Sequence, residues 1–172
     1  MAKFAILGSS YISRLRDFCE GDFKVPGDCR FFGKGGMRTD SIPHWMMADL
    51  ESFNPDVVFV HLGGNDIRRD SSPKDIFSNL CAIVETLKKS GAKVHIAEIC
   101  RRGDFSKAPG LMEASFNRQR NAINRLLIER YGKCIVKIPL QYPADYDNKL
   151  VHFSDYGIRK YFFMVRRVFL RC

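Results

Sequence analysis

The amino-acid sequence predicts an α/β domain, a three-layer sandwich in which a five-stranded parallel sheet carries helices on both faces. Short apolar runs typical of strands alternate five times with longer segments whose apolar residues recur at helical spacing. The strongest strand pattern, Val57–Leu62, is apolar and β-branched apart from His61, as expected of a central strand covered on both faces. Such alternation requires right-handed crossovers and therefore a parallel sheet.

In the first half of the chain, glycine and proline mark the boundaries of the predicted elements. An apolar run ends at Gly8, and a segment with apolar residues at helical spacing follows it. A second strand runs into a glycine cluster. The helix after that cluster ends before Pro55, because proline disfavours helical conformation in the residue that precedes it. The predicted elements are strand 4–8, helix 10–19, strand 30–32, helix 45–53 and strand 57–62.

In the second half, serine and glycine mark the helix ends. Ser72-Pro73 opens a helix with one apolar stripe, and Gly91 follows its end. Gly132 ends a long helix, and Ser154 is placed to cap the last one. The predicted elements are helix 73–89, strand 92–100, helix 112–131, strand 135–139 and helix 154–170.

Composition places the chain among ordinary globular proteins with a basic surface. Its 172 residues include 28 Lys and Arg against 19 Asp and Glu, a formal charge of +9. The length suits one domain over residues 1–172, and an apolar content of 45% excludes a disordered chain. Because no apolar run approaches about 18 residues and no signal peptide is recognisable, we expect an intracellular, cytoplasmic protein without a membrane span.

The six cysteines do not indicate a disulfide framework or a metal site. No pair has the spacing of a zinc or redox motif. Several of them lie in apolar surroundings, where reduced thiols are common. We therefore expect free thiols, no metal and no cofactor.

Ligands of open parallel sheets bind beyond the carboxyl ends of the strands, so the residues there are the ones to examine for function. The predicted topology places five segments at that edge. They are residues 8–10, 33–37, 63–66, 101–103 and 140–152.

These segments contain the groups that acyl transfer requires. The Ser10 hydroxyl is a candidate nucleophile at a tight turn between strand and helix, and His152 is a candidate base for its proton. The tetrahedral oxyanion needs donors, which are available as the Ser10 N–H, the Gly36 N–H and the Asn65 side-chain amide. Glycine allows close backbone approach, and the asparagine amide donates without carrying charge.

The order of these residues resembles a known family. Gly8-Ser9-Ser10, the Gly36 block, Gly63-Gly64-Asn65-Asp66 and Val151-His152-Phe153-Ser154 look like the four ordered blocks of the SGNH (GDSL-like) hydrolases. The resemblance extends from residue 4 to about 165. It implies a flavodoxin-like fold, Ser10 as nucleophile, Gly36 and Asn65 as oxyanion donors and His152 as base.

The acid that would orient His152 departs from the family pattern. The family places an aspartate three residues before the histidine, where this chain has Lys149. A cation there lowers the imidazole pKa, which opposes the task of the orienting acid. Asp147 is the nearest substitute, followed by Asp145 and Asp155. The alternatives are a Ser–His dyad oriented by a backbone carbonyl, or no catalysis.

The excess of positive charge falls into two groups. Cations on the helices over 112–131 and 154–170 are typical of a solvated face. The others lie at the predicted site edge, where they favour an anionic substrate or partner. They are Lys34, Arg38, Arg101, Arg102 and Lys149, of which we take Arg38, Arg101 and Lys149 as candidate substrate-binding residues.

The sequence therefore predicts a serine esterase that acts on small acyl esters, above all acetyl esters, through an acyl-enzyme on Ser10. Possible partners are a lipid substrate, nucleic acid or anionic membrane. Short domains of this kind are similar to the esterase domains of some LINE-type retrotransposon proteins, a resemblance that implies a ribonucleoprotein setting. The alternative function is a binding module for nucleic acid or anionic membrane, with the SGNH fold and weakened or absent catalysis.

Overall fold

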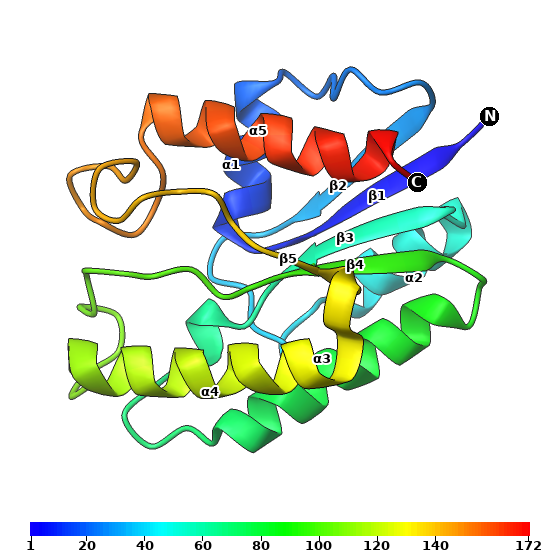
Figure 1. The fold of residues 1–172 in the computed structure, drawn as a ribbon. Coiled ribbons are helices and arrows are strands. Elements are labelled where there is room, and N and C mark those ends of the chain that lie inside the picture. Colours follow the sequence, from blue (N-terminus) through cyan, green and yellow to red (C-terminus); the bar gives the residue numbers. More distant parts are fainter.

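The computed structural model describes residues 1–172 as a five-stranded parallel sheet between two layers of helices (Figure 1). In chain order the elements are β1 (Lys3–Gly8), α1 (Ser10–Phe18), β2 (Asp28–Gly33), α2 (His44–Phe53), β3 (Val57–His61), the 3-10 helix η1 (Gly64–Asp66), α3 (Pro73–Lys88), β4 (Lys93–Ala97), α4 (Glu113–Tyr131), the 3-10 helix η2 (Gly132–Cys134), β5 (Ile135–Val136) and α5 (Asp155–Leu170). The strand order β2-β1-β3-β4-β5 is that of a flavodoxin-like fold, which confirms the predicted fold class.

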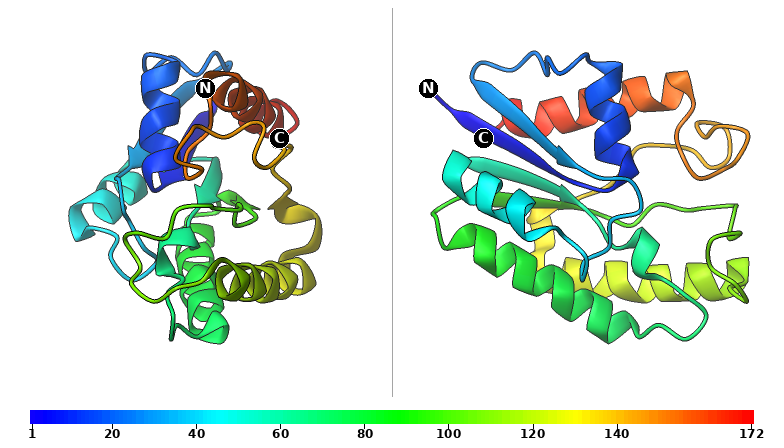
Figure 2. Two further views of the ribbon diagram at one scale, coloured as in Figure 1. Left: turned by 90° about the vertical axis from the view of Figure 1, so that its left-hand side faces the viewer. Right: turned by 180° about the vertical axis from the view of Figure 1, so that it is seen from behind.

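Two apolar cores lie on opposite faces of the sheet. Helices α1 and α5 cover one face, and α2, α3 and α4 cover the other (Figures 1 and 2). Successive residues of β1 alternate between the cores: Phe4 and Ile6 pack toward α1 and α5, whereas Ala5 and Leu7 pack toward the other helices. All five residues of β3 are buried, as predicted for a central strand.

The last two strands are shorter than the sequence pattern predicts. Strand β4 ends at Ala97 instead of residue 100, and β5 contains two residues instead of the predicted 135–139. The cause is competition from side chains for the backbone. The Asn124 side chain bonds to both the N–H and the C=O of Ile99, at 2.8 and 3.1 Å, and Glu98 Oε1 accepts from the Ile138 N–H at 2.9 Å. Side chains therefore replace the partner strand just beyond Ala97.

The cap of α5 fixes the end of the loop over residues 140–152, which carries His152 and is called the histidine loop below. Ser154 Oγ accepts a hydrogen bond from the Gly157 N–H at 3.1 Å, and the Ser154 N–H donates to the Asp145 carbonyl at 2.9 Å. Gly157 packs directly against that carbonyl, and an added Cβ would collide with its oxygen. The loop thus closes on itself through a serine cap and a close glycine contact.

His61 at the end of β3 is a buried core residue. Its Nδ1 lies 2.6 Å from the Tyr161 hydroxyl, and its Nε2 lies 3.6 Å from Cys100 Sγ. Burial lowers the pKa of His61 from its ordinary 6.5 to about 3. The imidazole is therefore neutral over the physiological range.

Gly157→Ala is expected to lower the free energy of unfolding by about 1–3 kcal/mol, because the new methyl group meets a backbone carbonyl that cannot move aside. Urea denaturation measures the loss. Gly35→Ala is the matched control, since no heavy atom lies within 4 Å of its added Cβ, and we expect a change of less than about 0.5 kcal/mol. Equal stability of the two variants would contradict this packing.

His61 is expected to make the fold less stable in acid. Between pH 6.5 and about 3 the unfolded chain binds a proton at this position that the folded chain does not, so the free energy of unfolding falls as the pH falls. One such proton contributes about 1.4 kcal/mol per pH unit. We therefore expect the difference in the free energy of unfolding between wild type and His61→Gln to be about 2 kcal/mol smaller at pH 5 than at pH 7. Denaturation at the two pH values measures it. The exposed His44, changed to Gln, serves as control, and parallel pH profiles for wild type and His61→Gln would refute the assignment.

Candidate active site

Ser10 and His152, the two residues predicted to act together, are in hydrogen-bonding contact. Ser10 follows β1 and is the first residue of α1. Its Oγ lies 2.9 Å from His152 Nε2, across 142 residues of sequence. Gly8 permits the turn between β1 and α1 because it packs against the backbone carbonyl of His61 in β3, where no Cβ would fit. The two strands at the point where the strand order reverses thus position the serine.

Tyr11 holds the histidine loop in place, a role that the sequence did not reveal. Its hydroxyl donates to the Val151 carbonyl at 2.9 Å, next to His152. Its ring stacks on His61 with centroids 4.6 Å apart and lies edge-on to His152 at 6.0 Å. The loop is closed from the other side by Phe153, which stacks on Tyr11 at 4.9 Å. The only sequence signal for this role is the position of Tyr11 beside Ser10.

The electrostatic surroundings of His152 favour a neutral imidazole. Its pKa lies below the ordinary value, mainly because burial penalises the charged ring and also because Arg14 repels it. Arg102 and Lys107 add to this repulsion, while the negative charge of Asp147 opposes it. A neutral ring at neutral pH is the form that accepts a proton from serine.

None of the three candidate acids forms a hydrogen bond with the His152 ring. The Asp147 N–H bonds to the His152 carbonyl at 2.9 Å, which places the two residues side by side, but the Asp147 carboxylate accepts from the Lys149 N–H at 3.1 Å. Asp145 is buried and paired with Lys160 at 2.9 Å. Asp155 is exposed in the first turn of α5. Of the three candidate acids, only Asp147 acts on the His152 ring, and it does so through its charge.

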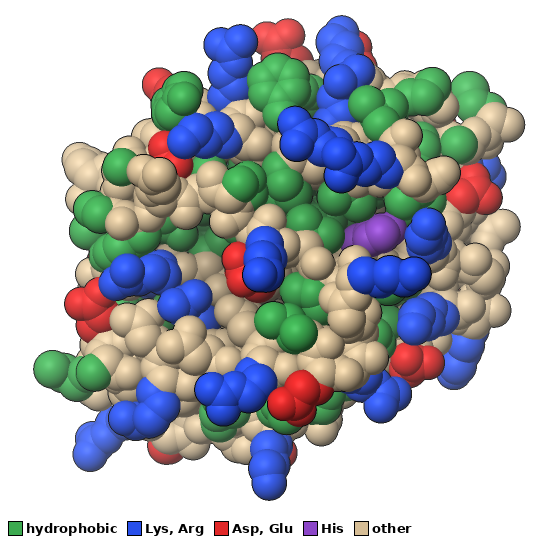
Figure 3. Space-filling model, in the orientation of Figure 1, with side chains coloured by type: hydrophobic (Ala, Val, Ile, Leu, Met, Phe, Trp, Pro, Cys, Tyr) green, Lys and Arg blue, Asp and Glu red, His purple; other side chains and the backbone are tan.

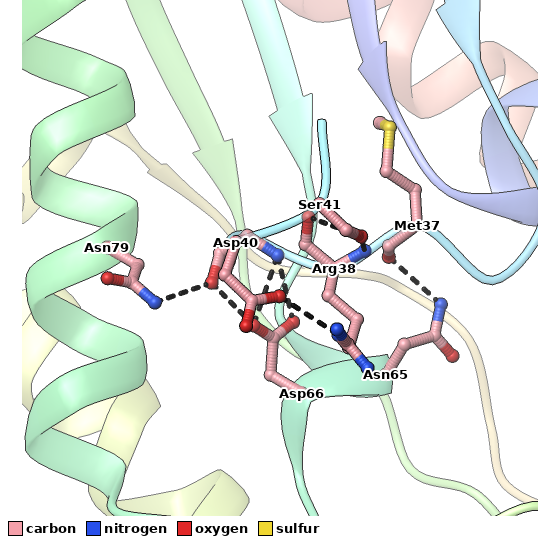
Figure 4. Close-up of polar contacts among 8 residues, drawn as sticks. Met37, Arg38, Asp40, Ser41, Asn65, Asp66 and Asn79 are labelled. Carbon is pink, nitrogen blue, oxygen red and sulfur yellow. Dashed lines mark hydrogen bonds and ion pairs between the residues drawn. The ribbon is translucent and has the colours of Figure 1, made fainter. Parts of the chain in front are cut away.

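Asn65 reaches the site from η1, immediately beyond β3. Gly63 precedes it with φ of +113°, in the left-handed region that favours glycine. The Asn65 amide donates one hydrogen to the Met37 carbonyl at 3.1 Å, as Figure 4 shows. Because the amide nitrogen carries two hydrogens, a second remains for a ligand.

The loop that carries Gly36 is braced by the neighbouring Asp66. The Asp66 carboxylate accepts from the Thr39 N–H at 3.0 Å and from the Thr39 hydroxyl, and the Asn79 amide of α3 donates to that hydroxyl at 3.1 Å (Figure 4). Gly36 itself has φ of +71°, a conformation that disfavours other residues. Asp66 thus braces the loop that follows Gly36 through its bonds to Thr39.

Arg102 fixes the orientation of the Asn65 side-chain amide. Its Nη2 donates to Asn65 Oδ1 at 3.0 Å, which leaves the Asn65 nitrogen facing the opposite way. The guanidinium carbon lies 5.7 Å from the centroid of the Phe116 ring, and its Nε is buried without a hydrogen-bond partner. The next residue, Gly103, donates its N–H to the Leu150 carbonyl at 2.7 Å in the histidine loop. The sequence placed Arg102 at this edge as one of several cations and did not indicate its contact with Asn65.

Two of the three candidate substrate-binding cations are engaged in ion pairs. Arg38 pairs with Asp40 at 2.9 Å. Arg101 lies 3.6 Å from Glu113 and stacks over Tyr142 at 4.3 Å. Lys149 forms no ion pair and is exposed, as is Lys34. The positive charge at this edge is therefore partly neutralised within the protein.

All six cysteines are free thiols, as expected, and no group of His, Cys, Asp or Glu side chains has the arrangement of a metal site. None of the helices has the length and apolar character that a membrane crossing requires.

Comparison with known proteins shows relatives of this chain in sequence and in fold. Over 50 residues, 29% of its length, the chain is 42% identical to an arylesterase of Vibrio mimicus, a match that spans about a quarter of the arylesterase. A GDSL-like lipase of Bacteroides thetaiotaomicron superposes with a TM-score of 0.81, at 15% identity, over 98% of this chain and 88% of the lipase. An acetyl xylan esterase, AlAXEase, superposes with a TM-score of 0.69, at 19% identity, over 96% and 98% of the two chains.

The similarity to retrotransposon esterase domains is not addressed by these relatives and stays a prediction.

Residues 9–160 match the GDSL-like Lipase/Acylhydrolase family, a segment that includes Ser10, Gly36, Asn65 and His152. The chain therefore belongs to the GDSL-like lipase and acylhydrolase family, the SGNH hydrolases.

Proposed function

We propose that this protein is a serine esterase with Ser10 as nucleophile and His152 as general base. The observation that carries the proposal is the 2.9 Å contact between Ser10 Oγ and His152 Nε2 at the carboxyl edge of the sheet. The low pKa of His152 supports it, because an uncharged ring can accept the serine proton at neutral pH.

The reaction proceeds through an acyl-enzyme. Ser10 Oγ attacks the ester carbonyl carbon while its proton passes to His152 Nε2. The tetrahedral intermediate then expels the alcohol, which takes that proton from His152, and the acyl group stays on Ser10. Water adds to the acyl carbon as His152 accepts one of its protons, and His152 returns the proton to Ser10 as the acid leaves.

The oxyanion of each tetrahedral intermediate is held by three donors. The Ser10 N–H lies at the start of α1, where it has no partner within the helix. The Gly36 N–H and the second Asn65 amide hydrogen complete the set. Arg102 supports the assignment of Asn65, because its bond to Oδ1 prevents the amide from rotating its oxygen toward a negative charge.

The proposed substrates are esters with a small acyl group, such as acetyl. Among the three candidate substrate-binding cations, Lys149 is the one that forms no ion pair, which suits it to an anionic part of the substrate.

The alternative function is a binding module with little or no catalysis. Its support is Lys149, where the family has an acid, together with the net charge of +9. The two functions differ in whether the Ser10 hydroxyl is activated, which a serine-directed reagent reports regardless of the natural substrate.

A fluorophosphonate probe is expected to label the wild type covalently at Ser10 and to leave Ser10→Ala unlabelled. His152→Ala should slow labelling and p-nitrophenyl acetate hydrolysis by at least about a hundredfold, because it removes the base. Ser13→Ala, on the same helix, is the control and should react like the wild type. Equal labelling of wild type and Ser10→Ala would rule out the esterase and favour the binding module.

Asp147→Asn is expected to lower kcat by less than about tenfold, since Asp147 acts on His152 through charge and not through a ring hydrogen bond. Loss of the acid from a hydrogen-bonded triad costs about 10⁴ in kcat. Removal of the negative charge should also lower the pKa of His152, which moves the acid limb of the pH–rate profile to lower pH. Asp155→Asn is the matched control. A thousandfold loss with Asp147→Asn would mean that Asp147 closes on the ring when substrate binds.

A further inference from the structure

A second concave site lies along the edge of the sheet, away from Ser10 and His152. It is a groove of about 820 Å³ between α5 on one side and β4, β5 and η2 on the other. Figure 3 shows this face, with one histidine in the hollow and Lys and Arg side chains around it. None of the residues that line the groove takes part in the candidate active site.

The groove lies where β5 begins too late to cover the first residues of β4. Strand β5 pairs only with Ile96 and Ala97, so Lys93–His95 have no strand on that side. The space is bounded by the second half of α5, which runs along this edge of the sheet (Figure 1). Residues 132–134, which would pair with Lys93–His95 in a longer strand, form η2 instead, and the trough lies beside this part of β4.

The charged side chains of Lys and Arg that line the groove have no acidic side chain among them. Lys160 pairs with the buried Asp145, and the other lining cations form no ion pair. The cations are Lys93, Lys133, Lys137, Lys160, Arg167 and Arg171. Elsewhere on the molecule seven cations have acidic partners, Arg38 and Arg101 among them. Five uncompensated charges around one hollow attract a polyanion.

The lining between the cations is apolar. Phe163 of α5 is 46% exposed, and Met164 and Val168 of the same helix line the groove beside it. Ile135 and Val136 contribute from β5. A polymer with a phosphate on each unit and a flat base between phosphates matches this arrangement of cations and apolar side chains. Phosphates bind cations, and bases stack on aromatic and apolar side chains.

We propose that this groove binds single-stranded nucleic acid. A duplex keeps its base faces stacked inside and would use only the cations, and a flat bilayer cannot enter a trough. The site is independent of the proposed esterase, since it shares no residue with it.

Fluorescence anisotropy with a labelled single-stranded oligonucleotide of about 12 residues tests the proposal. We expect binding at low salt that weakens with a slope of about −3.5 in log K against log salt, the value for five phosphate contacts on a single strand. An unlabelled duplex of the same length should compete poorly. Absence of binding at low salt would overturn the proposal.

Charge-matched variants separate the groove from net charge. The triple variant K133Q/K137Q/R167Q is expected to bind at least tenfold more weakly, and Phe163→Ala about fivefold more weakly through lost stacking. The control K89Q/R118Q/R125Q removes the same charge from exposed positions outside the groove and should bind within about twofold of wild type. Circular dichroism and fluorophosphonate labelling of Ser10 verify that each variant is folded.

Two results would refute the groove as the site. Equal weakening by both triple variants would show that only net charge matters. Binding to vesicles of phosphatidylcholine and phosphatidylserine that depends on the groove residues, without binding to the oligonucleotide, would assign the groove to anionic membrane instead. Failure of this experiment leaves the esterase proposal untouched, because Ser10 labelling is measured separately.

Discussion

Two adjacent residues, Arg102 and Gly103, tie together the two sides of the candidate active site. Arg102 donates to Asn65 on the oxyanion side at 3.0 Å, and the Gly103 N–H donates to the Leu150 carbonyl of the histidine loop at 2.7 Å. Serine, base and oxyanion donors come from segments as far as 142 residues apart, so their mutual positions need such a link. Catalytic geometry tolerates errors of only about half an ångström, and a shared anchor restricts relative movement of base and oxyanion donor.

The buried face of the site is equally constrained. Tyr11 lies between His61 in the core and the histidine loop, and each of its contacts is directional: a ring stack on one side and a hydroxyl bond to Val151 on the other. His61 stays neutral beneath it, so the stack adds no charge that would disturb His152. The residue after the candidate nucleophile therefore sets the position of the candidate base, which explains how an imidazole without a hydrogen-bonded acid keeps its orientation toward Ser10.

The sequence predicted the order of strands and helices and the meeting of Ser10 with His152, because periodicity and strand ends are local signals that the parallel sheet brings together. It did not predict the early ends of β4 and β5, since these depend on Asn124 and Glu98 side chains that bond to distant backbone. Nor did it reveal the roles of Tyr11 and Arg102. A tyrosine or arginine has many possible partners, and only the folded chain decides which one it meets.

The distribution of charge likewise depends on contacts that only the folded chain makes. A sum of +9 cannot say which cations are compensated, because an ion pair joins residues that the sequence separates. Arg38, predicted to meet substrate, pairs with Asp40, whereas Lys133 and Lys137 beside the short strand β5 remain without acidic partners. The edge that holds Ser10 and His152 is thus less positive than the sequence suggests. The groove beside α5 is more positive than the sequence suggests. The late start of β5 opens the trough, and the lysines beside it face a hollow that no acidic side chain lines.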